Sequence, residues 1–366
     1  MKKKIFFAPN TVRTAKWVVS SVIALGGSLA VFYASSDTLA EQSRFASNAR
    51  FAKNAGVFNN EKECSDAVNT PIYSAKRRFT EKAYQVAKQN NLIDRKEISE
   101  EQIADFFKGM DDPANFSSKS GSFMEFDQHS TSVEVMCETI LGKAELLSYS
   151  DPTDFERKKS WFGRLASICN TLDGQGTFVG NFNRVQLHLE ILKRVYDFQA
   201  NSAASSFQKS DLVASCVPAL QKPYDLALMF RTEDFRIQSM IDILRGAKKF
   251  DPASNVLERP KPLNGFEKVQ LVIPGVDSAW RSKLHSTFGK AIVDLQKTPN
   301  ELNDTDVKSL GWAVTNLYED PANTAYLRHF RIDFEGFGAK FNDKDMYTFK
   351  VTHPKSSVGQ PIETKN

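Results

Sequence analysis

Residues 183–199 read NRVQLHLEILKRVYDFQ, and this stretch carries the strongest fold signal in the chain. Its apolar residues fall on more than one side of a helix: Val185, Leu187, Leu189, Ile191, Leu192, Val195, Tyr196 and Phe198. A helix that is apolar on several sides packs against neighbours on several sides. We therefore expect 183–199 to be the central, most buried helix of a helical domain.

Around this stretch, helical periodicity extends over about residues 61–256. Ser99-Glu-Glu-Gln102 is a capping box, which marks a helix start. Asp followed by Pro provides an N-cap and a first helical residue that needs no N–H donor. This dipeptide indicates helix starts or tight turns at Asp112-Pro113, Asp151-Pro152, Asp251-Pro252 and Asp320-Pro321.

After a Pro-rich linker at 257–265, the apolar period changes from helical to two. Three segments alternate in this way: Val269 to Ile273, Phe330 to Phe334, and Tyr347 to Val351. Two helical stripes lie between the first and second of them, and Gly336-Phe337-Gly338 reads as a turn or bulge. The expected fold is mainly α with a C-terminal α+β domain. A helical bundle at 61–256 is followed, at 266–352, by a small antiparallel sheet covered by two helices. The polar residues 353–366 are expected to form a disordered tail.

The composition restricts the class of protein. Of the 366 residues, 41% are hydrophobic and 25% charged, which excludes a wholly disordered chain and a multi-spanning membrane protein. The net charge is +4, but five bases and no acid lie in residues 1–16. The other 43 bases face 44 acids, so the remainder carries −1. A nucleic-acid binder would carry its basic excess on the folded domain, so we expect no nucleic-acid partner.

The N-terminal pattern predicts a membrane anchor. Residues 1–16 form a basic segment, and residues 17–36 contain no charge and are long enough to span a bilayer. The positive-inside rule places residues 1–16 in the cytoplasm, and 37–60 follow as a juxtamembrane stalk. We expect a bacterial inner-membrane protein with a single pass and its body in the periplasm. The alternative is a cleaved signal peptide and a secreted protein, with Thr38-Leu39-Ala40 as the cleavage site.

Four cysteines are candidates for disulfides, because the membrane-anchored and the secreted alternatives both export the body to an oxidising compartment. They are Cys64, Cys137, Cys169 and Cys216. The last three lie on apolar stripes, so two interpretations stay open: disulfides that join neighbouring helices, or buried thiols without chemistry. The spacing shows no zinc-binding or redox motif, and we expect no metal and no cofactor.

The search for catalytic motifs is mostly negative: Ser206-Phe-Gln-Lys209 matches Ser-x-x-Lys, but no second element of that motif accompanies it. Gly174-Gln-Gly176-Thr-Phe-Val-Gly180 superficially resembles a phosphate-binding loop, but it follows a helical stripe and is better explained as a turn. The best polar group is a row on one predicted strand: His329, Arg331, Asp333 and Glu335. Such a row can line a ligand site, although it is more typical of the solvated face of a sheet.

The function hypotheses follow from the anchor and from these absences. The first is a membrane-anchored binding or scaffold protein of an envelope assembly, without catalysis, contacting the lipid bilayer through 17–36 and a protein partner outside it. The second is an envelope hydrolase with a non-local active site, for which the candidate bases are His188, His285 and His329. A third, a secreted effector, applies if the leader is cleaved.

Overall fold

Helix α7 (Phe178–Ala200) lies at the centre of the fold. In the computed structural model, which describes residues 58–115, 123–252, 254, 256–257, 288–289 and 334–352, it contacts α5, α6, α8, α9 and α14. Buried residues occur on several of its sides, from Phe178 to Val195. The prediction from 183–199 of a central, buried helix is confirmed. The helix begins five residues earlier than we predicted, because the Thr177 side chain accepts a hydrogen bond from the Gly180 N–H and caps it there.

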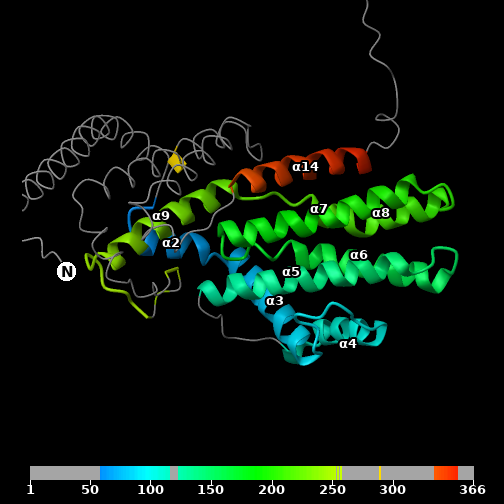
Figure 1. Ribbon diagram of the computed structural model, residues 1–366, viewed down its shortest axis with the longest axis horizontal. Helices are drawn as coiled ribbons and strands as arrows, with labels where there is room; N and C mark the ends of the chain where they lie inside the picture. Colours follow the sequence, from blue (N-terminus) through cyan, green and yellow to red (C-terminus); the bar gives the residue numbers. More distant parts are fainter. Residues whose placement is uncertain are drawn as a thin grey trace, which may run out of the picture.

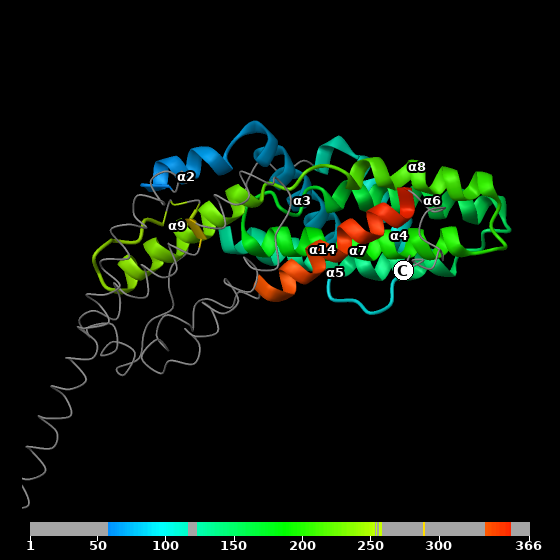
Figure 2. The ribbon, with the colours of Figure 1, turned by 90° about the horizontal axis from the view of Figure 1, so that it is seen from above.

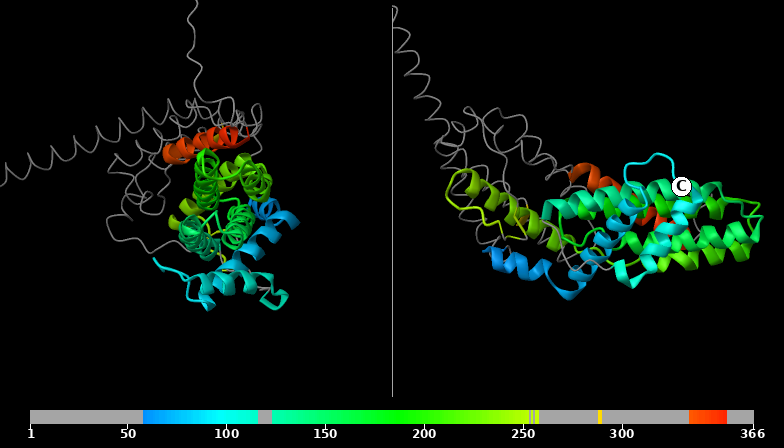
Figure 3. Two further views of the ribbon diagram at one scale, coloured as in Figure 1. Left: turned by 90° about the vertical axis from the view of Figure 1, so that its right-hand side faces the viewer. Right: turned by 90° about the horizontal axis from the view of Figure 1, so that it is seen from below.

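Four long helices form the body of the molecule: α5 (Phe123–Leu146), α6 (Pro152–Cys169), α7 and α8 (Ser206–Leu220). Short connections join them, so neighbours in sequence run antiparallel (Figure 1). The end-on view in Figure 3 shows α14 (Phe334–Thr352) on one side of this bundle and α4 (Glu100–Asp111) on the other.

The remaining helices extend the bundle. Helix α3 (Pro71–Gln89) packs against α5, and α4 packs against α3 and is followed by the short 3-10 helix η1 (Pro113–Asn115). Helix α9 (Leu226–Leu244) reaches beyond one end of the bundle and pairs with α2 (Glu61–Val68). Figure 2 shows α14 lying along α7, although more than 130 residues separate the two in sequence.

The helix-start signals act as the sequence indicates. Ser99 and Gln102 exchange both hydrogen bonds of the capping box at the start of α4. The Asp151 carboxylate accepts hydrogen bonds from the N–H groups of Thr153 and Asp154, with Pro152 at the first position of α6. These local hydrogen bonds need no tertiary partner, which is why they can be read directly from the sequence.

Apolar side chains from α3 to α8 make one large core. Its members include Phe106 of α4, Ile140 of α5, Leu165 of α6 and Leu187 of α7, all fully buried. A smaller cluster between α2 and α9 contains Phe58, Val68 and Leu228. The Arg231 guanidinium lies 4.2 Å from the centroid of the Phe58 ring.

The predicted C-terminal sheet is wrong. The described residues contain helices and no strand, and Tyr347, Phe349 and Val351 belong to helix α14, as does the predicted bulge at 336–338. Alternation over five residues is too short to exclude a helix. Over the whole segment Phe337, Phe341, Lys344 and Val351 recur at helical spacing, and these are the residues that α14 buries.

Several predicted segments lie outside the described residues. They are 1–57, the linker from residue 258 on, the tail, and most of the region between 258 and 333. Within the described part of the chain, no helix combines the length and the apolar character that crossing a bilayer requires. Phe288 is described, and its ring packs 5.9 Å from that of Phe230 on α9.

Candidate functional site

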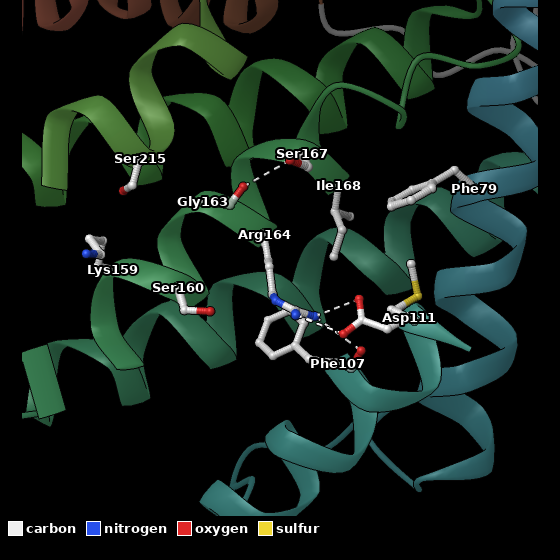
Figure 4. A pocket seen from close by; sticks show the side chains of 11 residues that line it. Phe79, Phe107, Asp111, Lys159, Ser160, Gly163, Arg164, Ser167, Ile168 and Ser215 are labelled. Carbon is white, nitrogen blue, oxygen red and sulfur yellow. Dashed lines mark hydrogen bonds and ion pairs between the residues drawn. The ribbon is translucent and has the colours of Figure 1, made fainter. Parts of the chain in front are cut away.

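A groove lies on the outer side of α6 (Figure 4). We call it the α6 groove, and its volume is about 470 Å³. Its floor is one face of α6: Lys159, Ser160, Gly163, Arg164, Ser167 and Ile168. Its walls come from three other helices: Phe79 of α3, Phe107, Met110 and Asp111 of α4, and Ser215 of α8.

The groove exists because α6 and α8 approach closely on one side while α4 lies beside α6 on the other. A Cβ at Gly163 would lie 2.9 Å from the carbonyl oxygen of Ser215, so only glycine permits this approach. On the α4 side, Arg157 forms an ion pair with Glu100, and Arg164 forms one with Asp111. These pairs hold α4 alongside α6 at two points.

Arg164 is the most constrained polar group in the groove. Its guanidinium donates to both carboxylate oxygens of Asp111, at 3.1 and 2.8 Å, and to the Phe107 carbonyl at 3.2 Å. It also lies 5.1 Å from the centroid of the Phe107 ring. The side chain is 38% exposed, so the guanidinium is rigid yet reachable from solvent.

The groove is polar at one end and apolar at the other (Figure 4). Lys159 and the hydroxyls of Ser160 and Ser215 occupy the first end, whereas Phe79 and Ile168 lie at the second. Lys159 bonds Asp211 at 2.8 Å and also contacts Glu156. Hydrogen bonds to Asp211 and then to Glu156 raise the pKa of Lys159, so it stays charged.

This set of groups suits binding better than proton transfer. Lys159 stays charged and cannot act as a base, and no histidine lies among the residues that line the groove to activate its hydroxyls. Among the described residues, no group of three or more His, Cys, Asp or Glu side chains is placed to hold a metal ion. An apolar recess with a few placed polar groups is the usual form of a binding site.

A second polar centre lies inside the bundle, around Arg184. Its guanidinium donates to Asp173 at 2.7 Å, to Asn170 at 3.2 Å and to the Lys222 carbonyl at 2.7 Å, and lies over the Tyr224 ring at 3.8 Å. Burial by itself would lower the pKa of Arg184, but Asp173 outweighs this and raises it. The arrangement ties the α6–α7 and α8–α9 connections to α7.

Asp173 also binds a second cation, Lys76 of α3, at 2.8 Å. Burial lowers the pKa of Lys76, and Asp173 opposes that effect.

The glycine-containing stretch 174–180 forms the turn into α7, as the sequence predicts. Gly176 has φ of +64°, and a Cβ at Gly174 would lie 2.8 Å from the Arg77 backbone nitrogen.

His188 is sealed in the interior, only 3% exposed. Its Nδ1 lies 2.9 Å from the Tyr224 hydroxyl, and its Nε2 has no hydrogen-bond partner. Burial, then Lys344 and Arg184, lower its pKa well below the usual range. His188 is thus a neutral core residue, and the structure does not pair it with a carboxylate.

Sequence reasoning missed one histidine–carboxylate pair. Nδ1 of His129 on α5 lies 2.9 Å from Glu81 on α3, and its ring stacks on Tyr84 at 3.6 Å. The two residues are 48 positions apart. No local motif could have linked them, because only the packing of α3 on α5 brings them together. The pair does not line the α6 groove.

The other candidate residues are distributed as follows. His285, His329, Arg331 and Asp333 lie outside the described residues, and Glu335 lies in α14.

The four cysteines are free thiols, all buried, so the structure forms none of the predicted disulfides. Burial raises the pKa of Cys64, Cys169 and Cys216 to about 12, and that of Cys137 well above its usual value.

Comparisons with protein-family models, with curated proteins and with solved structures find no match to this chain.

Proposed function

We propose that the protein is a membrane-anchored binding or scaffold protein of a bacterial envelope assembly, with its helical body in the periplasm. In this proposal the α6 groove receives an apolar segment of a partner protein. The observation that carries the proposal is the groove itself: a recess of about 470 Å³ with partly apolar walls, small residues at three positions of its floor (Ser160, Gly163 and Ser167) and a rigid, solvent-reachable arginine.

The chemistry of the groove supports a protein partner. Apolar side chains of the partner would cover Phe79 and Met110, which the fold leaves partly exposed, and such burial supplies most of the affinity of these contacts. The small serine side chains on the floor leave room for close approach of the partner backbone, and Arg164 can donate hydrogen bonds to a carbonyl or carboxylate of the partner at the edge. The groove lies over helices rather than loops, so its shape is preorganised.

The N-terminal pattern supports the location. A basic segment followed by a charge-free run of bilayer length is typical of a signal-anchor. The four free thiols are compatible with an oxidising compartment because burial keeps them protonated and out of reach, and a protonated thiol is a poor nucleophile. Catalysis has less support, because the buried, neutral His188 faces Tyr224 and not a carboxylate.

Co-purification from native membranes tests the proposal. Two variants of the full chain are compared with the wild type. Ser167→Trp fills the groove from an exposed position on its floor. Thr153→Trp is the control, because it places the same ring at an exposed position of α6 outside the groove. We expect a stoichiometric partner with the wild type and with Thr153→Trp, and its loss with Ser167→Trp. Equal recovery of the partner with both variants would contradict the groove as its binding site, and a wild type without a partner would contradict the scaffold function.

A further inference from the structure

The guanidinium of Arg164 keeps one edge free in the α6 groove. Its Nη1 donates to the Phe107 carbonyl and to Asp111, and its Nη2 donates to the other oxygen of Asp111. An arginine has five N–H donors, so the Nε–H and the second N–H of Nη2 are left without an acceptor among the described residues. These two N–H groups are parallel, which is the geometry that both oxygens of a carboxylate can accept together.

The free edge lies toward the polar end of the groove. In Figure 4, Asp111 lies on one side of the guanidinium, and Ser160 and Lys159 lie toward the other. Ser160 is exposed and precedes Arg164 by four residues, so the two side chains share one face of α6. A carboxylate bound to the free edge would therefore have a hydroxyl donor beside it.

The groove offers no free backbone N–H. All of its lining residues lie beyond the first turn of α3, α4, α6 or α8, so their N–H groups donate within their own helices. An extended segment in the groove would leave its own carbonyls without main-chain donors, whereas a helix satisfies its backbone internally. The groove is therefore suited to a helix, which presents only side chains to it.

The apolar wall begins beside the arginine. Met110 directly precedes Asp111 on α4, and Met110 and Phe79 are both only partly buried by the fold. Residues three or four positions apart on a helix lie on one face. A helix that places a carboxylate at Arg164 can thus cover Met110 and Phe79 with an apolar side chain one turn away.

Building on the proposed function of the groove, we propose that its partner segment is an amphipathic helix with an acidic residue one turn from an apolar residue. The acidic side chain binds side-on to the Nε–H and Nη2–H of Arg164, and Asp111 keeps its bonds at the end of the same guanidinium. The guanidinium lies between the two carboxylates, so each faces a positive charge before it faces the other. An amide in place of the acid would lose the charge-assisted bonds.

Selection from a displayed library of helical peptides, with the full chain in detergent as the target, tests the proposal without the natural partner. Peptides are kept when they bind the wild type and discarded when they bind Ser167→Trp, in which the groove is filled. We expect the recovered peptides to share an Asp or Glu three or four positions from an apolar residue. Recovered peptides without an acid, or no peptide that distinguishes the two chains, would overturn the proposal.

Fluorescence anisotropy of a recovered peptide then assigns its carboxylate to Arg164. Replacing the acid of the peptide by the matching amide should weaken binding to the wild type at least about tenfold, and Arg164→Gln should remove this preference. Arg164→Lys keeps the charge without the planar edge and should weaken binding as well. An acid preference that survives Arg164→Gln, or full affinity with Arg164→Lys, would overturn the proposal.

Arg157→Gln is the matched control for both variants. Arg157 also projects from α6, is also 38% exposed and also pairs with a carboxylate of α4, but it does not line the groove. We expect this variant to bind the acidic peptide as the wild type does. A loss equal to that of Arg164→Gln would show that the peptide responds to the general charge of α6, and would overturn the assignment to Arg164.

Co-purification separates a failure of the acidic helix from a failure of the proposed function. A native partner that is lost with Ser167→Trp but retained with Arg164→Gln would keep the groove as the binding site and overturn the acidic helix. A wild type without a native partner would contradict the scaffold function, while the peptide affinities would still decide the chemistry that the groove recognises.

Discussion

Two arginine–aspartate pairs in this protein have nearly the same geometry and very different surroundings. Arg184 bonds Asp173 at 2.7 Å inside the bundle, where each side chain is 1% exposed. Arg164 bonds Asp111 at 2.8 Å at the edge of the α6 groove, where the side chains are 38% and 64% exposed. Water reaches the Arg164–Asp111 pair and is excluded from the Arg184–Asp173 pair. The buried pair can therefore only stabilise the fold, whereas the exposed pair is accessible to a ligand.

The difference follows from the helices that carry the pairs. Arg184 projects from α7, which has neighbours on several sides, so its charge is satisfied by loop carbonyls and by Asp173. Arg164 projects from α6 toward the edge of α4, where solvent still reaches both members of the pair. A buried charge must be satisfied by the fold itself, whereas an exposed charge can exchange its partner for a ligand at little cost.

The largest effect is expected for Asp173→Asn, because it leaves Arg184 and Lys76 without their shared counter-charge. Breaking a buried pair costs roughly 3–5 kcal/mol of unfolding free energy. Urea unfolding of the full chain, followed by helical circular dichroism, measures the loss. A loss below about 1 kcal/mol would show that water reaches this centre, and the contrast between the two pairs would disappear.

A pH series tests the second buried charge site, at Glu134. Burial raises its pKa from 4.5 to about 8, so the folded chain keeps a proton that the unfolded chain has released. The stability that this group contributes is complete below about pH 4.5 and is lost as pH rises through about 8. We expect the unfolding free energy of the wild type to fall over this window relative to that of Glu134→Gln. Identical pH profiles would mean that Glu134 ionises normally in the folded protein.

Gly163→Ala tests the packing that shapes the groove. The added methyl would meet the Ser215 carbonyl oxygen at 2.9 Å and push α8 from α6, for a cost of about 1–3 kcal/mol. Gly142→Ala, on α5, is the matched control because no atom lies within 4 Å of its new Cβ. Helix propensity alone should make that control up to about 1 kcal/mol more stable. Equal effects at the two positions would remove Gly163 as the reason for the close approach.

The smallest effect on stability is expected for Asp111→Asn, the exposed counterpart of Asp173→Asn. A surface ion pair contributes about 0–1 kcal/mol, and salt screens most of it. The same urea titration, repeated at high salt, should show a small difference that shrinks further. A loss of unfolding free energy comparable to that of Asp173→Asn would mean that the Arg164–Asp111 pair stabilises the fold and is not an accessible surface pair.

The sequence predicts those features that depend on near neighbours. The capping box at Ser99, the N-cap at Asp151 and the buried character of α7 all appear in patterns a few residues long. Helix α14 shows where such patterns fail. Its last turns alternate like a strand, and only its docking on α7 reveals that Phe337, Phe341 and Val351 form one helical face.

The groove and the polar centres could not be read from the sequence at all. Gly163 and Ser215 meet across two helices, Glu81 reaches His129 across 48 positions, and Lys340 joins Gln186 across 154. None of these contacts has a sequence spacing that recurs, so no motif describes them. The cysteines likewise show apolar surroundings in sequence, but their separation in the fold decides that they stay free.

By itself, therefore, the sequence predicted a helical region over about residues 61–256, in which the structure places helices up to Leu244. It also predicted the central place of α7 and the helix starts at Ser99 and Asp151, because hydrogen bonds and hydrophobic periodicity along one helix are local. It also carries the basic and apolar N-terminal pattern. Only the tertiary structure decided which charges are buried and which are open to a partner. That decision depends on how closely helices distant in sequence approach one another, and on whether water remains between them.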